Sequence, residues 1–266
     1  MSFFTVQDLS AGYGGRTILH DISFTLGSGM LLGVLGENGS GKTTLLKAVC
    51  GILPHTGTCA LDGATFEGLS ARRIARYASY IPQRSGISID ISVLDVVLMG
   101  FNPRLGLLEH PSAAMRAAAL KMLETVGLGG REHENYLHLS EGQKQLCILA
   151  RTLVTGGRLL LLDEPESALD FRYRHRMLEI LRNWIAADRR GGIVTLHDPA
   201  LALGCCDRLL LLHEGRMTGM LDPRRDPLPA LEEKLSVLYG AVSLQRCTDR
   251  RGGQHLVMLK EREAWT

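Results

Sequence analysis

The stretch GENGSGKT at residues 36–43 combines residue types and a spacing that suit the binding of phosphate groups. It matches the pattern G-x-x-x-x-G-K-[ST] in full, follows the apolar segment MLLGVL and opens a helical pattern, which is the context that the motif requires. Backbone N–H groups can curve around phosphate oxygens at three glycines: Gly36, Gly39 and Gly41. We expect Lys42 to reach the β- and γ-phosphates and Thr43 to ligate Mg²⁺. The string N-K-x-D does not occur, so a GTPase is not indicated.

A second group of reactive side chains ends the leucine run LLLLDE at residues 159–164. A carboxylate at the carboxyl end of a buried strand can hold Mg²⁺ opposite Thr43, and this is the role predicted for Asp163. Glu164 is predicted to position and deprotonate the attacking water. His197 ends the segment GIVTLHD, where it would donate a hydrogen bond to the transferring phosphoryl group. A lone histidine is more often structural, so the residues alone leave both interpretations of His197 open.

The stretch LSEGQ at residues 139–143 carries a helix-start signal, because Ser140 is followed by Gln143 three positions later. A capped helix start directs backbone N–H groups and the positive end of the helix dipole outward. Glu141 suits the first turn of such a helix, and Gly142 allows a close approach. The spacing therefore predicts a helix start that can also receive an anion.

The elements that must position these side chains alternate between strands and helices. The N-terminal stretch looks β-rich, with the apolar segments SFFTVQDLS, ILHDISFTLGSG and MLLGVLG and a hairpin turn at LDGA, residues 61–64. Helical periodicity predicts helices over 42–50, 113–126 and about 141–154, each followed by glycine. LLLLDE and GIVTLHD are predicted to be buried strands. A short helix from Leu231 and a hairpin across RRGGQ complete the chain, so we expect an α/β core with a mainly helical insertion at 87–157.

Composition limits the classes of protein that this chain can represent. It has 266 residues and a net charge of +2, with no Lys/Arg tract, and we expect no nucleic-acid partner. The six cysteines form no C-x-x-C pair, so neither a zinc site nor a redox dithiol is predicted, and four of them are expected to fill the core: Cys50, Cys147, Cys205 and Cys206. No signal peptide or membrane-spanning apolar run is evident, so we expect a soluble chain that can still have a membrane partner.

Together these features resemble the ATP-binding cassette (ABC) ATPases over nearly the whole chain. GENGSGKT resembles the Walker A motif, LLLLDE the Walker B motif and LSEGQ the signature LSGGQ, although Glu141 replaces its third-position glycine. Gln83 in YIPQ resembles the Q-loop glutamine, and SALD at 167–170 resembles the D-loop, which includes Asp170. His197 in TLHD resembles the switch histidine, and Tyr13 in AGYGG resembles the aromatic residue that stacks on adenine. These motifs occur in the family's order.

The resemblance implies a fold and a set of ATP contacts. The fold is a P-loop NTPase core of the RecA-like type, with an N-terminal antiparallel β subdomain, an inserted α-helical subdomain at 87–157 and a C-terminal extension at 222–266. Mg²⁺ would be held by Thr43, Gln83 and Asp163, and the catalytic set would be Glu164, His197 and Gln83. Besides Tyr13, the residues implied to contact ATP within the chain are Gly36, Glu37, Asn38, Gly39, Ser40, Gly41, Lys42, Thr43 and Thr44.

The resemblance also implies partners. Two cassettes would pair head to tail, so that Ser140, Gly142 and Gln143 of one chain contact the ATP of the other, and ATP would close this homodimer. Residues 92–112 are similar to cassettes of importers for iron–siderophore complexes, haem, cobalamin or molybdate, with FNPR matching their R-x-P-H stretch in part. In that interpretation the chain works at the cytoplasmic face of the cell membrane with two permease subunits and a substrate-binding protein.

Other classes of the superfamily are less consistent with the chain. A DNA-repair ATPase would carry a long coiled coil between Gln83 and Ser140, where only about 55 residues lie, and a translation factor would carry two Walker A motifs. A soluble cassette of iron–sulfur cluster assembly remains the alternative. Glu166, in DEPES, stands where Thr or Ser is usual, and the sequence suggests no role for it.

Overall fold

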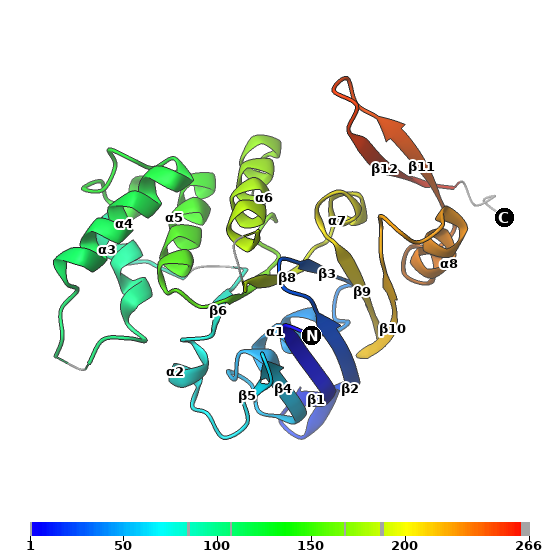
Figure 1. Cartoon of the computed structure of the whole chain (residues 1–266), viewed down its shortest axis with the longest axis horizontal. Coiled ribbons are helices and arrows are strands. Elements are labelled where there is room, and N and C mark those ends of the chain that lie inside the picture. The colour runs from blue at the N-terminus through cyan, green and yellow to red at the C-terminus, as the bar shows by residue number, and fades with distance from the viewer. Residues whose placement is uncertain (1, 84–85, 107, 168, 187–188, 262–266) are drawn as a thin grey trace.

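The computed structural model describes residues 2–83, 86–106, 108–167, 169–186 and 189–261. Its central sheet has six strands in the order β10-β9-β3-β8-β7-β6 (Figure 1). These strands are β3 (Leu31–Leu35), β6 (Ala78–Ile81), β7 (Leu159–Asp163), β8 (Gly191–Thr195), β9 (Arg208–His213) and β10 (Arg216–Leu221). Five of them are parallel, and β10 pairs with β9 antiparallel at one edge. The carboxyl ends of β3, β7 and β8 therefore lie together at one end of the sheet.

The leucine run of β7 is explained by burial on both faces of this sheet. Leu160 and Leu162 pack in one apolar cluster with the helical insertion, and Leu159 and Leu161 pack in a second cluster with the N-terminal strands. Alternate residues of a strand point to opposite faces, so a strand covered on both sides needs apolar residues throughout. The flanking helices are α1 (Lys42–Val49), α6 (Phe171–Ile185) and α7 (Pro199–Cys205).

The N-terminal strands form a separate antiparallel sheet in the order β2-β1-β4-β5. Its members are β1 (Phe4–Tyr13), β2 (Arg16–Leu26), β4 (His55–Leu61) and β5 (Ala64–Thr65). Leu61 pairs with Ala64, which confirms the predicted hairpin turn at LDGA. Helix α1 packs its apolar face into the same cluster as this sheet, so the sheet braces the helix that follows the phosphate loop.

The residues between β6 and β7 form the mainly helical segment that the sequence predicts. It contains α3 (Val93–Leu98), α4 (Ala113–Val126), α5 (Glu141–Val154) and two 3-10 turns, Met99–Phe101 and Tyr136–His138. Gly127 ends α4 in a left-handed conformation with φ 82°, as a helix stop requires. Because β6 and β7 are neighbours in the sheet, the whole segment projects from between two adjacent strands (Figure 1). Between β6 and β7, residues 84–85 and 107 lie outside the described residues.

The C-terminal part consists of α8 (Leu228–Tyr239) and a hairpin of β11 (Val242–Thr248) and β12 (Gln254–Lys260). The hairpin turn is where the sequence predicts it, and the helix begins three residues before the predicted Leu231 because Pro227 and Pro229 are suited to its first turn. Strand β8 ends at Thr195, so the prediction that it runs to residue 198 was wrong. Short helix α2 (Ala71–Ile74) precedes β6.

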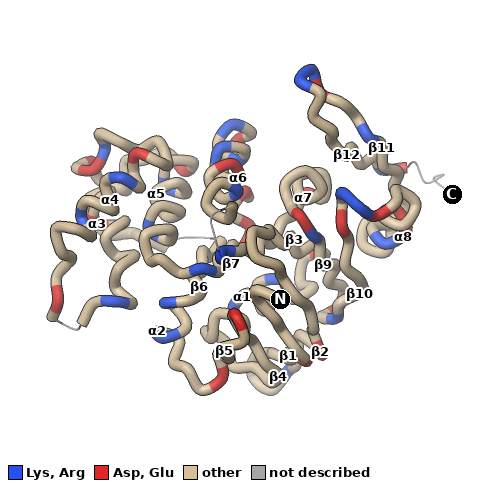
Figure 2. Tube along the Cα trace, viewed as in Figure 1, with Lys and Arg blue, Asp and Glu red and all other residues tan. Residues whose placement is uncertain are grey.

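Three of the four cysteines expected in the core are buried, namely Cys50, Cys147 and Cys206, whereas Cys205 is only half-buried. No helix in the described part of the chain is both long and apolar enough to cross a membrane. Charged residues of both signs are interspersed along the elements (Figure 2).

Candidate functional site

The phosphate loop lies between the end of β3 and the start of α1, as the sequence predicts. A Cβ atom on Gly36 would lie 2.3 Å from the carbonyl oxygen of Leu212 and 2.5 Å from Ser40 Oγ, so only glycine fits there. Lys42 Nζ donates hydrogen bonds to the carbonyl oxygens of Gly36 (2.8 Å) and Glu37 (3.1 Å). The lysine side chain thus folds back over its own loop, and its ammonium group lies against the loop carbonyl oxygens.

The ammonium group of Lys42 is a buried positive charge facing three buried acids. Burial lowers the pKa of Lys42, and the charges of Glu164, Asp163 and Glu166 oppose that shift, in that order of strength. Lys42 Nζ lies 3.8 Å from Glu164 Oε1. The lysine therefore connects the end of β3 with the acids that follow β7.

Asp163 ends β7 and accepts hydrogen bonds from three side chains. Thr43 Oγ1 and Thr195 Oγ1 both donate to its Oδ1, at 3.1 Å and 2.9 Å, and Tyr80 OH donates to Oδ2 at 3.1 Å. Burial raises the pKa of Tyr80, with the neighbouring Asp163 charge adding to the shift, so this phenol stays a donor. The predicted pair of Thr43 and Asp163 is thus brought together across 120 positions of sequence.

The donor set at this point fits Mg²⁺. The hydroxyl of Thr43 and the carboxylate of Asp163 are hard oxygen ligands of the kind that Mg²⁺ takes together with phosphate oxygens. Asp163, Glu164 and Glu166 are all buried within reach of a single lysine, so the site carries an excess of negative charge that a divalent cation would offset. Gln83, the third predicted ligand, instead donates to Glu164.

Glu164 is held by two of the side chains that the sequence assigns to catalysis. Gln83 Nε2 donates to Glu164 Oε2 at 2.7 Å, and His197 Nε2 lies 2.6 Å from the same oxygen. The backbone of Glu164 is left-handed, with φ 47°, and its N–H donates to Thr195 Oγ1 at 2.8 Å. A non-glycine residue in this conformation is strained by about 1–3 kcal/mol and needs surrounding contacts to hold it. Segments near residues 83, 164 and 197 thus converge on one carboxylate.

Two residues of this site, Tyr80 and Thr195, were not predicted from the sequence. Tyr80 lies on β6 and contacts Asp163 from the neighbouring strand, and Thr195 is the last residue of β8. Both are polar residues at or near the end of an apolar strand, and that was the only sequence signal available. The strand order was needed to show that their side chains meet Asp163.

The predicted capping box at the start of α5 is present. Ser140 Oγ accepts from the N–H of Gln143, and the Gln143 side chain accepts from the N–H of Ser140. Glu141 is exposed and pairs with Lys144 at 2.8 Å, so its carboxylate points along the helix surface. A Cβ on Gly142 would lie 2.7 Å from the ring of Tyr173 on α6, which gives this glycine a packing role.

The remaining predicted contacts lie apart from the phosphate loop or at its rim. Within the described ranges, no hydrogen bond or ion pair joins Ser140, Gly142 or Gln143 to that loop. Tyr13 is exposed at the end of β1. Asp170 caps α6 by accepting from the N–H of Tyr173 at 2.9 Å, while Ala168 of the SALD stretch lies outside the described residues.

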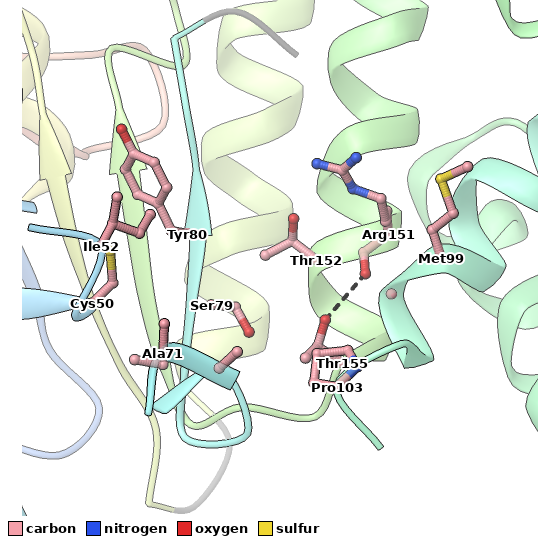
Figure 3. A pocket seen from close by; sticks show the side chains of 13 residues that line it. Cys50, Ile52, Ala71, Ser79, Tyr80, Met99, Pro103, Arg151, Thr152 and Thr155 are labelled. Carbon is pink, nitrogen blue, oxygen red and sulfur yellow. Dashed lines mark hydrogen bonds between the residues drawn. The ribbon is translucent and has the colours of Figure 1, made fainter. Parts of the chain in front are cut away.

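A cavity of about 260 Å³ lies between part of the core and the helical segment (Figure 3). Ile52 and Tyr80 line it from the core, and Met99, Pro103 and Arg151 line it from the opposite side. Burial lowers the pKa of Arg151. Since Tyr80 also contacts Asp163, one side chain links this cavity with the acidic site.

A family model described as ABC transporter matches residues 19–167. The hemin import ATP-binding protein HmuV of Deinococcus radiodurans is 38% identical over 240 residues, which cover 88% of this chain and 89% of that protein. The protein of the same name from Pseudomonas entomophila is 38% identical over 259 residues, covering 93% and 96%. A solved chain of a metal-chelate type ABC transporter in an inward-facing conformation has a TM-score of 0.82 at 26% identity, covering 98% and 99%.

Proposed function

This chain is a member of the ABC transporter family, as its ATP-binding and ATP-hydrolysing cassette, and on that premise we propose that it powers import of hemin or a related metal chelate. One observation supports assigning ATP hydrolysis to particular residues: the side chains of Gln83, His197 and Lys42 all lie against the Glu164 carboxylate. The cargo is proposed from the relatives, which are named for hemin import, and from the structural neighbour, which is of the metal-chelate type.

Each side chain of the site has a role in this proposal. Glu164 Oε2 accepts the proton of the attacking water, while Gln83 and His197 hold that carboxylate in place and orient the water. Lys42 leaves its loop carbonyls to contact the β- and γ-phosphates, and the loop N–H groups receive phosphate oxygens. Thr43 and Asp163 would hold Mg²⁺, which supplies positive charge to the transferring phosphoryl group when bound.

We propose that the start of α5 acts on the ATP of a second copy of the chain. Ser140, Gly142 and Gln143 lie in the first turn of a capped helix, where free N–H groups and the helix dipole favour an anion. ATP bound between two such chains would bridge the phosphate loop of one and α5 of the other, so a head-to-tail homodimer closes only with nucleotide. Asp170 and Tyr13 are proposed to contact the partner chain and the adenine, respectively.

The cavity between the core and the helical segment is the proposed docking place for a permease. Its lining combines apolar side chains such as Ile52 and Met99 with polar ones and a half-buried cation, Arg151, which suits a short amphipathic segment. Movement of a segment docked there would reach Tyr80, and through it Asp163. This link supports a complex with two permease subunits at the cytoplasmic face of the membrane, served by a substrate-binding protein.

Purification from its host membranes tests the importer assignment. The tagged chain, with Glu164→Gln to trap the ATP-bound state, is expected to bring a polytopic membrane protein out of detergent extracts. Recovery of cluster-assembly proteins in its place would support the alternative function in iron–sulfur assembly, which the relatives do not favour.

Reconstitution of the recovered complex in liposomes tests the cargo. The binding protein loaded with hemin is expected to stimulate ATP hydrolysis, and the unloaded binding protein serves as the control. Stimulation by a ferric siderophore but not by hemin would refute the hemin assignment while leaving the importer assignment standing.

A further inference from the structure

The backbone N–H groups of Leu196 and His197 anchor the segment that carries His197. After β8 ends at Thr195, the N–H of Leu196 donates to the Val34 carbonyl oxygen at 3.3 Å, and the chain then leaves the sheet. The next N–H, that of His197, donates to Glu166 Oε1 at 3.1 Å. Asp198 caps α7 with its side chain. The Glu166 carboxylate is therefore the acceptor that fixes the backbone of His197 itself.

Glu166 is an unusual group to find at this position. It is 3% exposed, and burial raises the pKa of its carboxyl group. One of its oxygens accepts from His197, and the other, Oε2, is buried with no hydrogen-bond partner among the described residues. Burying a carboxyl group that is only half satisfied is costly, so a buried group of this kind calls for an explanation.

The position of His197 matters because of what its ring contacts. His197 Nε2 lies 2.6 Å from Glu164 Oε2, the oxygen that also accepts from Gln83. The ring is partly exposed, so packing alone does not lock its orientation. A shift of the His197 backbone would draw the ring away from Glu164 and leave Gln83 as the remaining hydrogen-bond donor to Oε2.

We propose that Glu166 is a positioning residue for ATP hydrolysis, which fixes the His197 amide and thereby holds the His197 ring against Glu164. The proposal rests on the function proposed above for Glu164 and His197. Glu166 acts through the backbone of His197 and touches no reacting atom.

Three substitutions separate this role from plain structural support. Glu166→Gln keeps an acceptor oxygen at the same reach, whereas Glu166→Met keeps the length and removes the acceptor. Because Glu166→Met loses one positioning hydrogen bond, its kcat is expected to be about fivefold to tenfold lower than that of the wild type, with an unchanged KM for ATP. Glu166→Gln is expected to retain most of the wild-type kcat. Glu166→Thr is expected to lower kcat as Glu166→Met does. It serves as the test variant if the methionine variant does not fold. An equal kcat for wild type, Glu166→Met and Glu166→Thr would overturn the proposal.

A double-mutant cycle with His197→Ala shows whether the effect passes through His197. Once the ring is gone, Glu166→Met is expected to cause no further loss of kcat, because there is nothing left to position. Equal losses from Glu166→Met in both backgrounds would refute the coupling. If His197→Ala itself leaves kcat unchanged, the proposed role of His197 fails and this inference fails with it. If His197→Ala lowers kcat and Glu166→Met does not, only the inference is overturned.

Discussion

Replacement of Thr195 by valine tests the geometry of the site most directly, because the hydroxyl group of Thr195 ties two acids together. Thr195 Oγ1 donates to Asp163 Oδ1 at 2.9 Å and accepts from the N–H of Glu164 at 2.8 Å. The side chain is fully buried, so water cannot take over either bond. Valine keeps the shape and removes both contacts.

The expected effect on stability follows from these two bonds. The N–H of Glu164 becomes a buried donor without an acceptor, which costs about 1–3 kcal/mol, and Asp163 loses a hydrogen bond to a charged group worth about 1.5–3 kcal/mol. The two losses share one hydroxyl group and do not add fully, so we expect a decrease of about 2–4 kcal/mol in the free energy of unfolding. The left-handed backbone of Glu164 also loses its anchor, so we expect kcat to fall about tenfold or more with little change in the KM for ATP.

The assay pairs urea unfolding with steady-state ATP hydrolysis and uses Thr195→Ser as the matched control. Serine keeps the hydroxyl group and loses only a methyl group, at a cost of about 0.5–1.5 kcal/mol. The valine variant should therefore be the less stable and the slower of the two. If both variants lose the same stability, or if the valine variant hydrolyses ATP as fast as the serine variant, the bridge between Asp163 and Glu164 does not have the role described.

Four further perturbations address the rest of the site. Glu164→Gln should bind ATP, lower kcat about a hundredfold or more and accumulate a closed dimer in size-exclusion chromatography; turnover at the wild-type rate would exclude Glu164 as the base. Lys42→Ala should weaken ATP binding about tenfold or more in an equilibrium titration, and unchanged affinity would contradict the assignment of the phosphate loop. Gly142→Ala should lower both ATP hydrolysis and stability, the latter by about 1–3 kcal/mol, because the new Cβ meets the Tyr173 ring. Glu141→Gly should leave hydrolysis within about twofold, since Glu141 faces Lys144, and a severalfold rise would identify Glu141 as a brake on dimer closure.

The phosphate loop and the start of α5 were predictable because their geometry is local. A glycine-rich turn followed by Lys42 and a helix fixes where the backbone N–H groups point, and Ser140 with Gln143 caps α5 from three residues away. The hairpin at residues 61–64 and the helix stop at Gly127 are local in the same sense. Such features depend on dihedral preferences and hydrogen bonds within a few residues, which the sequence contains in full.

Other elements were not predicted individually because their signals are not local. Strands β6, β9 and β10 and helix α6 are set by packing against the rest of the sheet, and short apolar runs do not distinguish a strand from a buried helix. The predicted end of β8 was too late in the sequence. The N–H of Leu196 still donates to a carbonyl oxygen of β3, whereas the N–H of His197 already donates to the Glu166 carboxylate. The end of the strand is thus decided by an acceptor 31 residues away.

The sequence by itself determined which residues are the candidates for the chemistry: Lys42, Thr43, Asp163 and Glu164 were predicted from residue types and spacing, and His197 from the resemblance to the ABC ATPases. Only the tertiary structure decided how they meet. The strand order β3-β8-β7-β6 brings Thr195 and Tyr80 to Asp163 and brings Gln83 and His197 to one oxygen of Glu164. It also gives Glu166 a partner. The physical reason is that a parallel sheet gathers strand ends from distant parts of the chain, and a hydrogen bond between them depends on a register that no single segment specifies.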